Sequence, residues 1–218
     1  MDPKTIAEIL LRIKAVTLNA KEPYTYASGI RSPIYCDNRL LLSYPEERMK
    51  IVEAMMDIIK ANNLEFDIIA GVATSGIPHA AWLADKLQKP MIYIRGKAKE
   101  HGKGNQIEGR LEQGQKVLVV EDLISTGGSS FNALESAREA GAGCNDLIAI
   151  FTYTMEKSKS SAAEKKINVY PLTDFPTLIG VAAEKGYITE EKKAVVLEWS
   201  VDPSGWGPKH GFENAAAD

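Results

Sequence analysis

The residues best able to do chemistry cluster where a predicted strand meets a loop of small polar side chains. Val117 to Val120 is an apolar run typical of a buried strand, and the carboxylates of Glu121 and Asp122 follow at its predicted end. Hydroxyl residues and glycines then lead into a helix predicted from about Phe131 to Ala140, and the connecting residues are Leu123, Ile124, Ser125, Thr126, Gly127, Gly128 and Ser129. We therefore predict a strand–loop–helix unit with two acids at the start of its loop.

This loop is suited to a phosphate group. Backbone N–H groups at a helix N-terminus can bind an anion, the helix dipole adds partial positive charge, and glycines allow close approach. The acidic pair would repel a phosphate, so Glu121 and Asp122 are expected to bind sugar hydroxyls or a metal ion instead. A ribose that carries a 5-phosphate meets both requirements. The sequence lacks the lysine of a Walker A loop and the glycine pattern of a dinucleotide-binding loop.

A second loop of the same physical kind is predicted earlier in the chain. Phe66 to Ala70 is typical of a short buried strand, and a helix is predicted from Ile77 to Leu87. The turn at 71–76 is a candidate anion site because it places small residues before a helix, among them Ala73, Thr74, Ser75 and Gly76. His79, inside the predicted helix, is expected to be packed or solvated rather than catalytic.

The segment 95–115 is rich in glycine and in positive charge. A long glycine-rich loop within a compact domain is usually functional or disordered. Cations beside two anion sites would neutralise a diphosphate, and glycines suit a lid that closes and excludes water. The cations at the start of the segment are Arg95, Lys97, Lys99 and His101.

Length and composition indicate an ordinary globular enzyme. The 218 residues are predicted to form one domain over 1–200 and a C-terminal tail over 201–218. A net charge of −3 gives no bulk attraction to nucleic acid. The two cysteines, Cys36 and Cys144, lack metal-ligand spacing and suggest reduced thiols in a cytoplasmic protein. Neither a signal peptide nor a membrane-spanning run is expected.

Strands alternate with helices along most of the chain. Helices are predicted at 3–19, 45–62, 158–165, 174–183 and 190–197, and further strands at 91–94, 146–152 and 167–172. This alternation predicts an α/β fold with a mostly parallel central sheet flanked by helices and with ligand loops at the carboxyl ends of the strands. Residues 20–42 lack helical periodicity and concentrate Tyr24, Tyr26 and Tyr35, so short strands or loops are expected there.

Residues 117–130 resemble the signature with which type I phosphoribosyltransferases bind phosphoribosyl pyrophosphate (PRPP). Within that family, three further stretches, 28–35, 71–78 and 95–102, resemble those of the orotate phosphoribosyltransferases, and together they cover 28–130 in the expected order. The resemblance implies the type I phosphoribosyltransferase fold, with a small N-terminal hood from roughly 1–44 plus C-terminal elements.

The resemblance also implies an activity, a cofactor and roles for residues. It implies transfer of ribose 5-phosphate from PRPP to orotate in pyrimidine biosynthesis, with Mg²⁺ on the diphosphate and Asp122 as the candidate protein ligand of that ion. It assigns catalysis to Lys99 and Asp122, pyrophosphate contacts to 73–76, and orotate contacts to Ser125, Tyr35 and Cys36. The PRPP contacts that it implies are 121–129 together with Arg95, Lys97, Lys99 and His101. It implies a homodimer in which the 95–110 loop reaches the partner's site. A purine phosphoribosyltransferase and a non-enzymatic PRPP-sensing regulator are the alternatives.

The sequence departs from the family pattern at three places. Ala27 stands where several orotate phosphoribosyltransferases have a lysine, and Gly96 stands where a basic residue often follows Arg95. The stretch Phe151 to Met155 has no arginine, although some members carry one there that touches the orotate carboxylate. Orotate is therefore expected to find its charge partner elsewhere.

Overall fold

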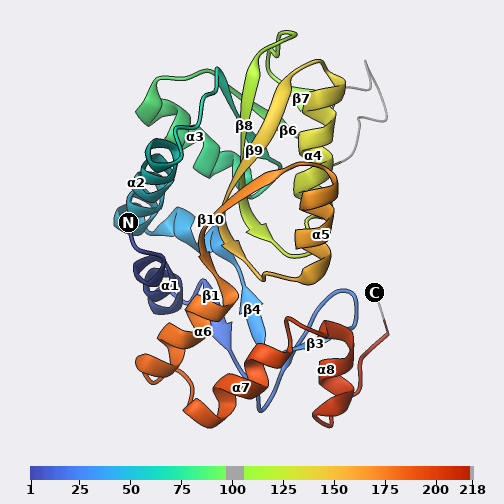
Figure 1. Ribbon diagram of the computed structural model, residues 1–218. Coiled ribbons are helices and arrows are strands. Elements are labelled where there is room, and N and C mark those ends of the chain that lie inside the picture. The colour runs from blue at the N-terminus through green and yellow to red at the C-terminus, as the bar shows by residue number, and fades with distance from the viewer. Residues whose placement is uncertain (97–105, 217–218) are drawn as a thin grey trace.

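The computed structural model describes residues 1–96 and 106–216. Its core is a six-stranded sheet in the order β10-β9-β8-β5-β6-β7 (Figure 1). Its strands are β5 (Ile68–Val72), β6 (Met91–Ile94), β7 (Ile107–Glu108), β8 (Lys116–Ile124), β9 (Gly143–Thr152) and β10 (Asn168–Asp174). All neighbours pair in parallel except β6 and β7, which are antiparallel. The predicted α/β fold with a mostly parallel sheet is confirmed.

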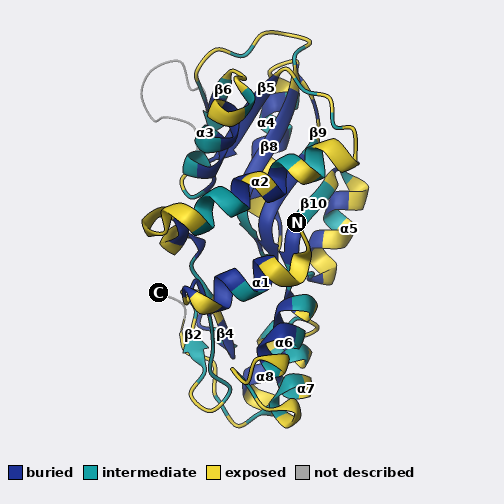
Figure 2. Cartoon of the chain, turned by 90° about the vertical axis from the view of Figure 1, so that its left-hand side faces the viewer, coloured by how far each residue is buried: buried dark blue, intermediate teal, exposed yellow. Residues whose placement is uncertain are grey.

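Helices cover both faces of this sheet, as Figure 1 shows. α2 (Pro45–Ala61) and α3 (Gly76–Leu87) lie on one side, and α4 (Gly128–Glu139) and α5 (Glu156–Glu164) on the other. The strands are buried on both faces, so alternate residues enter two cores. In β8, Leu118 and Val120 join the core on the α2 and α3 side, whereas Val117 and Val119 join the core beneath α4. Figure 2 shows the sheet buried between helices whose outer faces are exposed.

A smaller part of the molecule lies at the end of the sheet where β8 and β9 finish, and we call it the hood (Figure 1). Its strands β1 and β4 pair antiparallel, as do β2 and β3, and a 3-10 helix follows. The elements of the hood are β1 (Val16–Leu18), β2 (Tyr24–Thr25), β3 (Arg31–Ser32), β4 (Ile34–Cys36) and η1 (Asn38–Ser43). The helices around it are α1 (Pro3–Arg12), α6 (Phe175–Glu184), α7 (Glu190–Glu198) and α8 (Pro203–Lys209).

Two predicted boundaries differ from the structure. The first helix ends at Arg12 rather than near Asn19, because Lys14 takes a positive φ of 59° and Val16 then pairs with Cys36 in a strand. The expected C-terminal tail contains α8, and Trp206 in it is only 2% exposed. Gly and Pro made this stretch look like a tail, but Asp202 caps the helix at Gly205 and Pro203 occupies its first turn.

Candidate active site

Strand β8 extends further than predicted and carries the acidic pair inside it. Its pairing with β5 ends at Gly71 opposite Val120, whereas its pairing with β9 continues to Ile124 opposite Thr152. Glu121 and Asp122 therefore do not follow the strand, as predicted, but lie within it, beyond the end of β5. The apolar run identified only the part of β8 that has a hydrogen-bonded neighbour on both sides.

Glu121 is nearly inaccessible, with an exposed fraction of 5%. Its Oε2 accepts a hydrogen bond from Ser130 Oγ at 2.9 Å, and its Oε1 accepts one from the backbone N–H of Asp122 at 3.0 Å. Burial, and secondly the negative charge of Asp122, raise the pKa of Glu121 to about 8. Glu121 is thus the member of the pair that holds a proton near neutral pH.

Asp122 is half-buried on the opposite side of the strand. Burial raises the pKa of its carboxyl, while hydrogen bonds from its surroundings and the positive charge of Arg39 oppose that rise. Its backbone carbonyl accepts a hydrogen bond from Asn38 Nδ2 at 2.7 Å, so the hood is fastened to the acidic segment of β8. Burial thus outweighs these opposing interactions, and the pKa of Asp122 is raised.

The predicted phosphate loop joins β8 to α4. Gly127 is the N-cap of α4, has a φ of 84° and contributes no side-chain acceptor, and no acid occupies the first turn. The first N–H groups of a helix have no intrahelical acceptor, so they remain able to bind an anion. A Cβ on Gly127 would overlap the ring of Phe131, which holds the loop from beneath. Thr126, Gly128 and Ser129 are exposed at the end of the sheet.

The second predicted anion loop lies directly against β8 at the acidic pair. It connects β5 to α3 through Ala73, Thr74 and Ser75, and the peptide bond between Ala73 and Thr74 is cis. A Cβ built on Gly76 would lie 2.5 Å from the carbonyl oxygen of Val120 and 3.4 Å from Glu121 Cα. The N-terminus of α3 therefore touches the backbone of β8 at the acidic pair. Two helix N-termini, both suited to anions, flank the two carboxylates.

The glycine-rich segment begins and ends at a short hairpin. Strands β6 and β7 pair through Ile94 and Ile107, and the backbone N–H of Arg95 donates to the carbonyl of Gln106 at 2.9 Å. Strand β7 was not predicted, because two residues are too few to show a period. The Arg95 guanidinium lies 3.6 Å from the carboxylate of Glu108. Lys97, Lys99 and His101 lie outside the described residues, so their predicted roles remain predictions.

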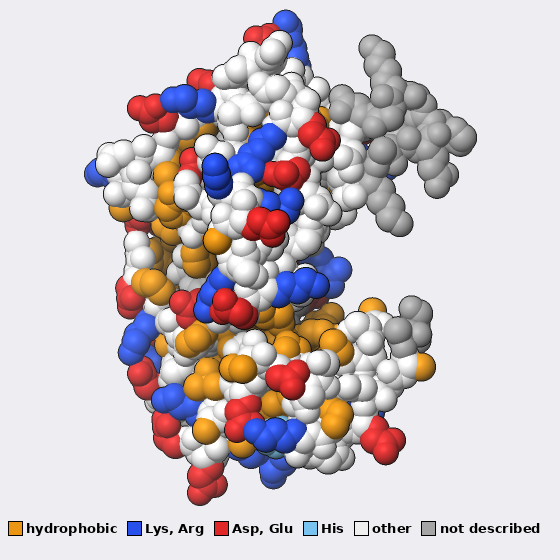
Figure 3. All heavy atoms as spheres, turned by 45° about the vertical axis from the view of Figure 1, so that its right-hand side comes forward, with side chains coloured by type: hydrophobic (Ala, Val, Ile, Leu, Met, Phe, Trp, Pro, Cys, Tyr) orange, Lys and Arg blue, Asp and Glu red, His pale blue; other side chains and the backbone are white. Residues whose placement is uncertain are grey.

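The hood carries three tyrosine rings that lie close to one another, and the residue after one of them, Cys36, lies near Asp122. The ring of Tyr35 is 42% exposed and lies with its centroid 5.6 Å from that of Tyr24 and 6.4 Å from that of Tyr26. Burial, and secondly the charge of Asp122, raise the pKa of the Cys36 thiol well above its ordinary value. Figure 3 shows the molecular surface hollowed between the part that holds the sheet and the part that holds the hood.

Comparison with known proteins agrees with this arrangement. A family model described as "Phosphoribosyl transferase domain" matches residues 41–176. The chain belongs to the phosphoribosyl transferase family. An orotate phosphoribosyltransferase of Coxiella burnetii is 56% identical over 93% of this chain and 97% of its own length, and one of Listeria innocua is 54% identical over 94% and 98%. A crystal structure of orotate phosphoribosyltransferase from Aeropyrum pernix matches with a TM-score of 0.73 at 27% identity, over 84% of this chain and 99% of that one. The predicted resemblance and the predicted fold are confirmed.

The structure also brings in residues that the sequence did not single out. Asn38 and Ser130 fix the two acids, and the Met155 sulfur lies 3.8 Å from Ser125 Oγ. Tyr153 is 2% exposed, its N–H donates to the carbonyl of Ile124, and its hydroxyl lies 3.1 Å from that of Tyr26. Ser130 stood inside the signature, but the other three come from hood and β9 segments whose approach only tertiary structure reveals.

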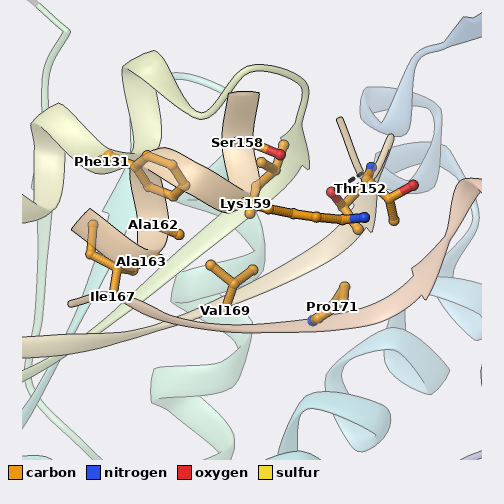
Figure 4. A pocket seen from close by; sticks show the side chains of 11 residues that line it. Phe131, Thr152, Ser158, Lys159, Ala162, Ala163, Ile167, Val169 and Pro171 are labelled. Atoms are coloured by element: carbon orange, nitrogen blue, oxygen red, sulfur yellow. Dashed lines mark hydrogen bonds between the residues drawn. The ribbon is translucent and has the colours of Figure 1, made fainter. Parts of the chain in front are cut away.

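A cavity of about 390 Å³ lies apart from the acidic pair, beneath α4 and α5 (Figure 4). Its walls are mostly apolar, with Phe131, Ala162, Ile167 and Val169 among them, and the side chain of Lys159 extends along it toward Thr152. The cavity contains neither acid of the pair, so it is not the candidate active site. Within 1–96 and 106–216, none of the helices is long and apolar enough to cross a membrane.

Proposed function

We propose that this chain is an orotate phosphoribosyltransferase, a pentosyltransferase that transfers ribose 5-phosphate from PRPP to orotate and releases pyrophosphate. The carrying observation is the acidic pair held between two helix N-termini in a chain more than half identical to curated orotate phosphoribosyltransferases. A ligand with phosphate at both ends and a ribose between them matches this charge pattern in order. The product would be orotidine 5′-phosphate, in pyrimidine biosynthesis in the cytoplasm.

The proposed reaction requires little covalent participation by protein side chains. Bond cleavage at C1 of the ribose develops positive charge there and negative charge on the departing pyrophosphate, so positioning and electrostatic stabilisation dominate. Glu121 loses its proton as the ligand binds, and both Glu121 and Asp122 then accept hydrogen bonds from the ribose hydroxyls and face the developing positive charge. Ser125 to Ser129 bind the 5-phosphate through backbone N–H groups and hydroxyls, and 73–76 bind the pyrophosphate.

The acceptor base lies on the hood side in this proposal. Tyr35 and Cys36 line that side, and Ser125 reaches it from the phosphate loop. Because the side chains of Ala27 and of residues 151–155 carry no positive charge, neither place supplies a cation for the orotate carboxylate. Backbone N–H groups of the hood are the proposed substitutes.

The remaining cations act on pyrophosphate. Arg95, Lys97, Lys99 and His101 would neutralise it as it leaves, with Lys99 the catalytic member, and the loop would exclude water as it closes. Among the described residues no cluster of three or more acids, histidines and cysteines could by itself hold a metal ion. One carboxylate from Asp122 together with PRPP oxygens nevertheless matches the oxygen ligands that Mg²⁺ prefers. The ion would offset charge on the diphosphate.

The deciding experiment offers PRPP and Mg²⁺ with orotate, uracil, hypoxanthine or xanthine in turn and follows pyrophosphate release. We expect release with orotate alone, and no release in excess EDTA. Release with hypoxanthine or xanthine instead would identify a purine phosphoribosyltransferase. PRPP binding without turnover of any base would identify a non-enzymatic PRPP sensor.

We further propose a homodimer in which the 95–110 loop serves the partner's site. Lys99→Ala and Asp122→Asn homodimers should each be nearly inactive. In the mixed dimer, the Lys99→Ala subunit keeps a sound ribose site and receives an intact loop from its partner. Activity should then return to roughly half of wild type if the sites are independent. A well-folded mixed dimer without activity would show that Lys99 acts within its own subunit.

A further inference from the structure

The C-terminal residues 202–216 form a strap that is anchored at one end. Trp206 of α8 is buried, and its Nε1 donates to the carbonyl of Val195 at 2.7 Å. The strap then turns, with the N–H of Phe212 donating to the carbonyl of Gly207 at 2.8 Å and its ring stacking on Trp206. The part after α8 is thereby directed back toward the hood. Figure 1 shows the C-terminal end of the chain beside the loop between β2 and β3.

The residues of the strap after α8 form hydrogen bonds with the loop between β2 and β3. Arg31 Nε donates to the carbonyl of Glu213 at 2.9 Å, and the N–H of Arg31 donates to Asn214 Oδ1 at 3.2 Å. The N–H of Ala215 donates to the carbonyl of Gly29 at 3.0 Å. Asn214 also donates from Nδ2 to the carbonyl of Ser204 at 2.9 Å, so one side chain ties the hood loop to α8.

Glycines make this close contact possible. Gly29 has a φ of 79°, and a Cβ on it would overlap the carbonyl of Ala215. A Cβ on Gly207 would lie 2.9 Å from Arg31 Cβ. The hood loop and the strap therefore meet at backbone distance on two sides of Arg31.

A hydrogen-bond network begins at Ser32, the residue after Arg31, and leads toward the candidate site. Ser32 is fully buried, and its Oγ lies 3.2 Å from Tyr26 Oη and 2.8 Å from the carbonyl oxygen of Ile34. Tyr26 Oη in turn lies 3.1 Å from Tyr153 Oη, and the Tyr26 ring meets that of Tyr35 edge-on. The strap thus holds the start of a network that ends at the ring proposed to face the acceptor base.

We propose that the strap is a positioning element that sets the hood loop, and through it Tyr26 and Tyr35, for the acceptor base. This inference rests on the proposed function, because it takes the hood as the orotate side. The two anion loops are positioned by β5 and β8 instead, so the strap should affect the use of orotate and leave the use of PRPP unchanged.

Three variants test this separation. One ends the chain after His210, which keeps α8 and its packing against Arg31 but removes the strap's hydrogen bonds to Gly29 and Arg31. Asn214→Ala removes a single linking side chain. Glu213→Ala is the matched control, because the structure uses only its backbone carbonyl. For each variant and for the wild type, we would measure KM for orotate, KM for PRPP, kcat and the thermal midpoint Tm.

We expect the shortened chain to raise the orotate KM roughly tenfold and Asn214→Ala to raise it roughly threefold. These values follow from the net free energy of the hydrogen bonds lost, since about 1.4 kcal/mol corresponds to a tenfold change in affinity. The PRPP KM should stay within about twofold, and Glu213→Ala should resemble wild type. Unchanged orotate KM in Asn214→Ala, or equal rises in both KM values, would overturn the proposal, whatever happens to Tm. If the shortened chain fails to fold, the Asn214 and Glu213 pair decides. A wild type that releases no pyrophosphate with orotate would refute the proposed function as well as this one, whereas an active wild type with unaltered variants would refute the strap alone.

Discussion

Gly127 offers a way to separate two costs of adding a methyl group at the phosphate loop. In Gly127→Ala, the new Cβ meets a positive φ of 84° and the ring of Phe131. The left-handed backbone costs a non-glycine residue about 1–2 kcal/mol, and the less flexible unfolded chain returns about 0.4–1 kcal/mol. Overpacking against the buried Phe131 ring costs about 1–3 kcal/mol more. We therefore expect a loss of about 2–4 kcal/mol in the free energy of unfolding.

Two other glycines supply controls, one for the cost of a positive φ and one for a new methyl group that meets neither strain nor a contact. Gly114 has a φ of 85° and nothing within 4 Å of a built Cβ, so Gly114→Ala should lose only about 1 kcal/mol. Gly180 lies in α6 with nothing within 4 Å, so Gly180→Ala should gain up to about 1 kcal/mol from helix propensity. In a chain of this size, 1 kcal/mol corresponds to about 2–4 °C in the midpoint of thermal unfolding.

Urea unfolding, with both its midpoint and its slope, measures the free energy of unfolding of the three variants. PRPP titration measures the affinity of the phosphate loop. The first turn of α4 must shift to make room for the methyl group, so Gly127→Ala should also bind PRPP more weakly. Replacing the ring with a smaller side chain, in Gly127→Ala/Phe131→Leu, should restore part of the lost stability and part of the lost PRPP affinity. The reasoning fails if Gly127→Ala and Gly114→Ala lose the same stability, because the ring contact would then cost nothing.

Three further predictions follow from the buried titratable groups. Asp122→Asn should keep the wild-type Tm and lose most of its kcat/KM, and near-wild-type turnover would remove Asp122 from the mechanism. Binding of PRPP with Mg²⁺ at pH 7 should release a proton, because Glu121 begins with a pKa of about 8 and hydroxyl donors or a cation favour its ionised form. Calorimetry in two buffers of different ionisation enthalpy measures the number of protons released. A binding enthalpy that does not depend on the buffer would contradict the prediction. Burial lowers the pKa of His79 from 6.5 to about 4, so the unfolded chain binds the extra proton between those values and the free energy of unfolding should rise with pH from about 4 to 6.5. His79→Leu should flatten that rise, and parallel pH profiles for the two proteins would show that His79 is not its source.

The central strands β5, β8 and β9 were predictable because they are largely buried on both faces and bounded by turns. Met91–Ile94 was predicted with the bounds that the structure has, and the helix at 45–62 differs by one residue. The signature loop was predictable for a local reason, since its residues follow one another along the chain. The acids were misplaced relative to the strand end, because the length of β8 is set by β9, which pairs with it from 143 onward.

The hood could not be derived in the same way. Its strands have two or three residues each, which is too short for a period to appear, and each is held by a partner elsewhere in the chain. Trp199 illustrates this: it lies near the C-terminal end, yet its Nε1 donates to the carbonyl of Arg31 at 3.2 Å and its ring meets Tyr153. Contacts over such sequence separations leave no local pattern.

The contact at Gly76 fixes the N-terminus of α3 against the acidic segment of β8. Because backbone meets backbone there, no side-chain rearrangement can separate the second anion loop from the acidic pair without moving α3 away from β8. Under the proposed function, the distance from the ribose site to the pyrophosphate loop is therefore set by the main chain. We expect that distance to survive most changes to the side chains that surround it.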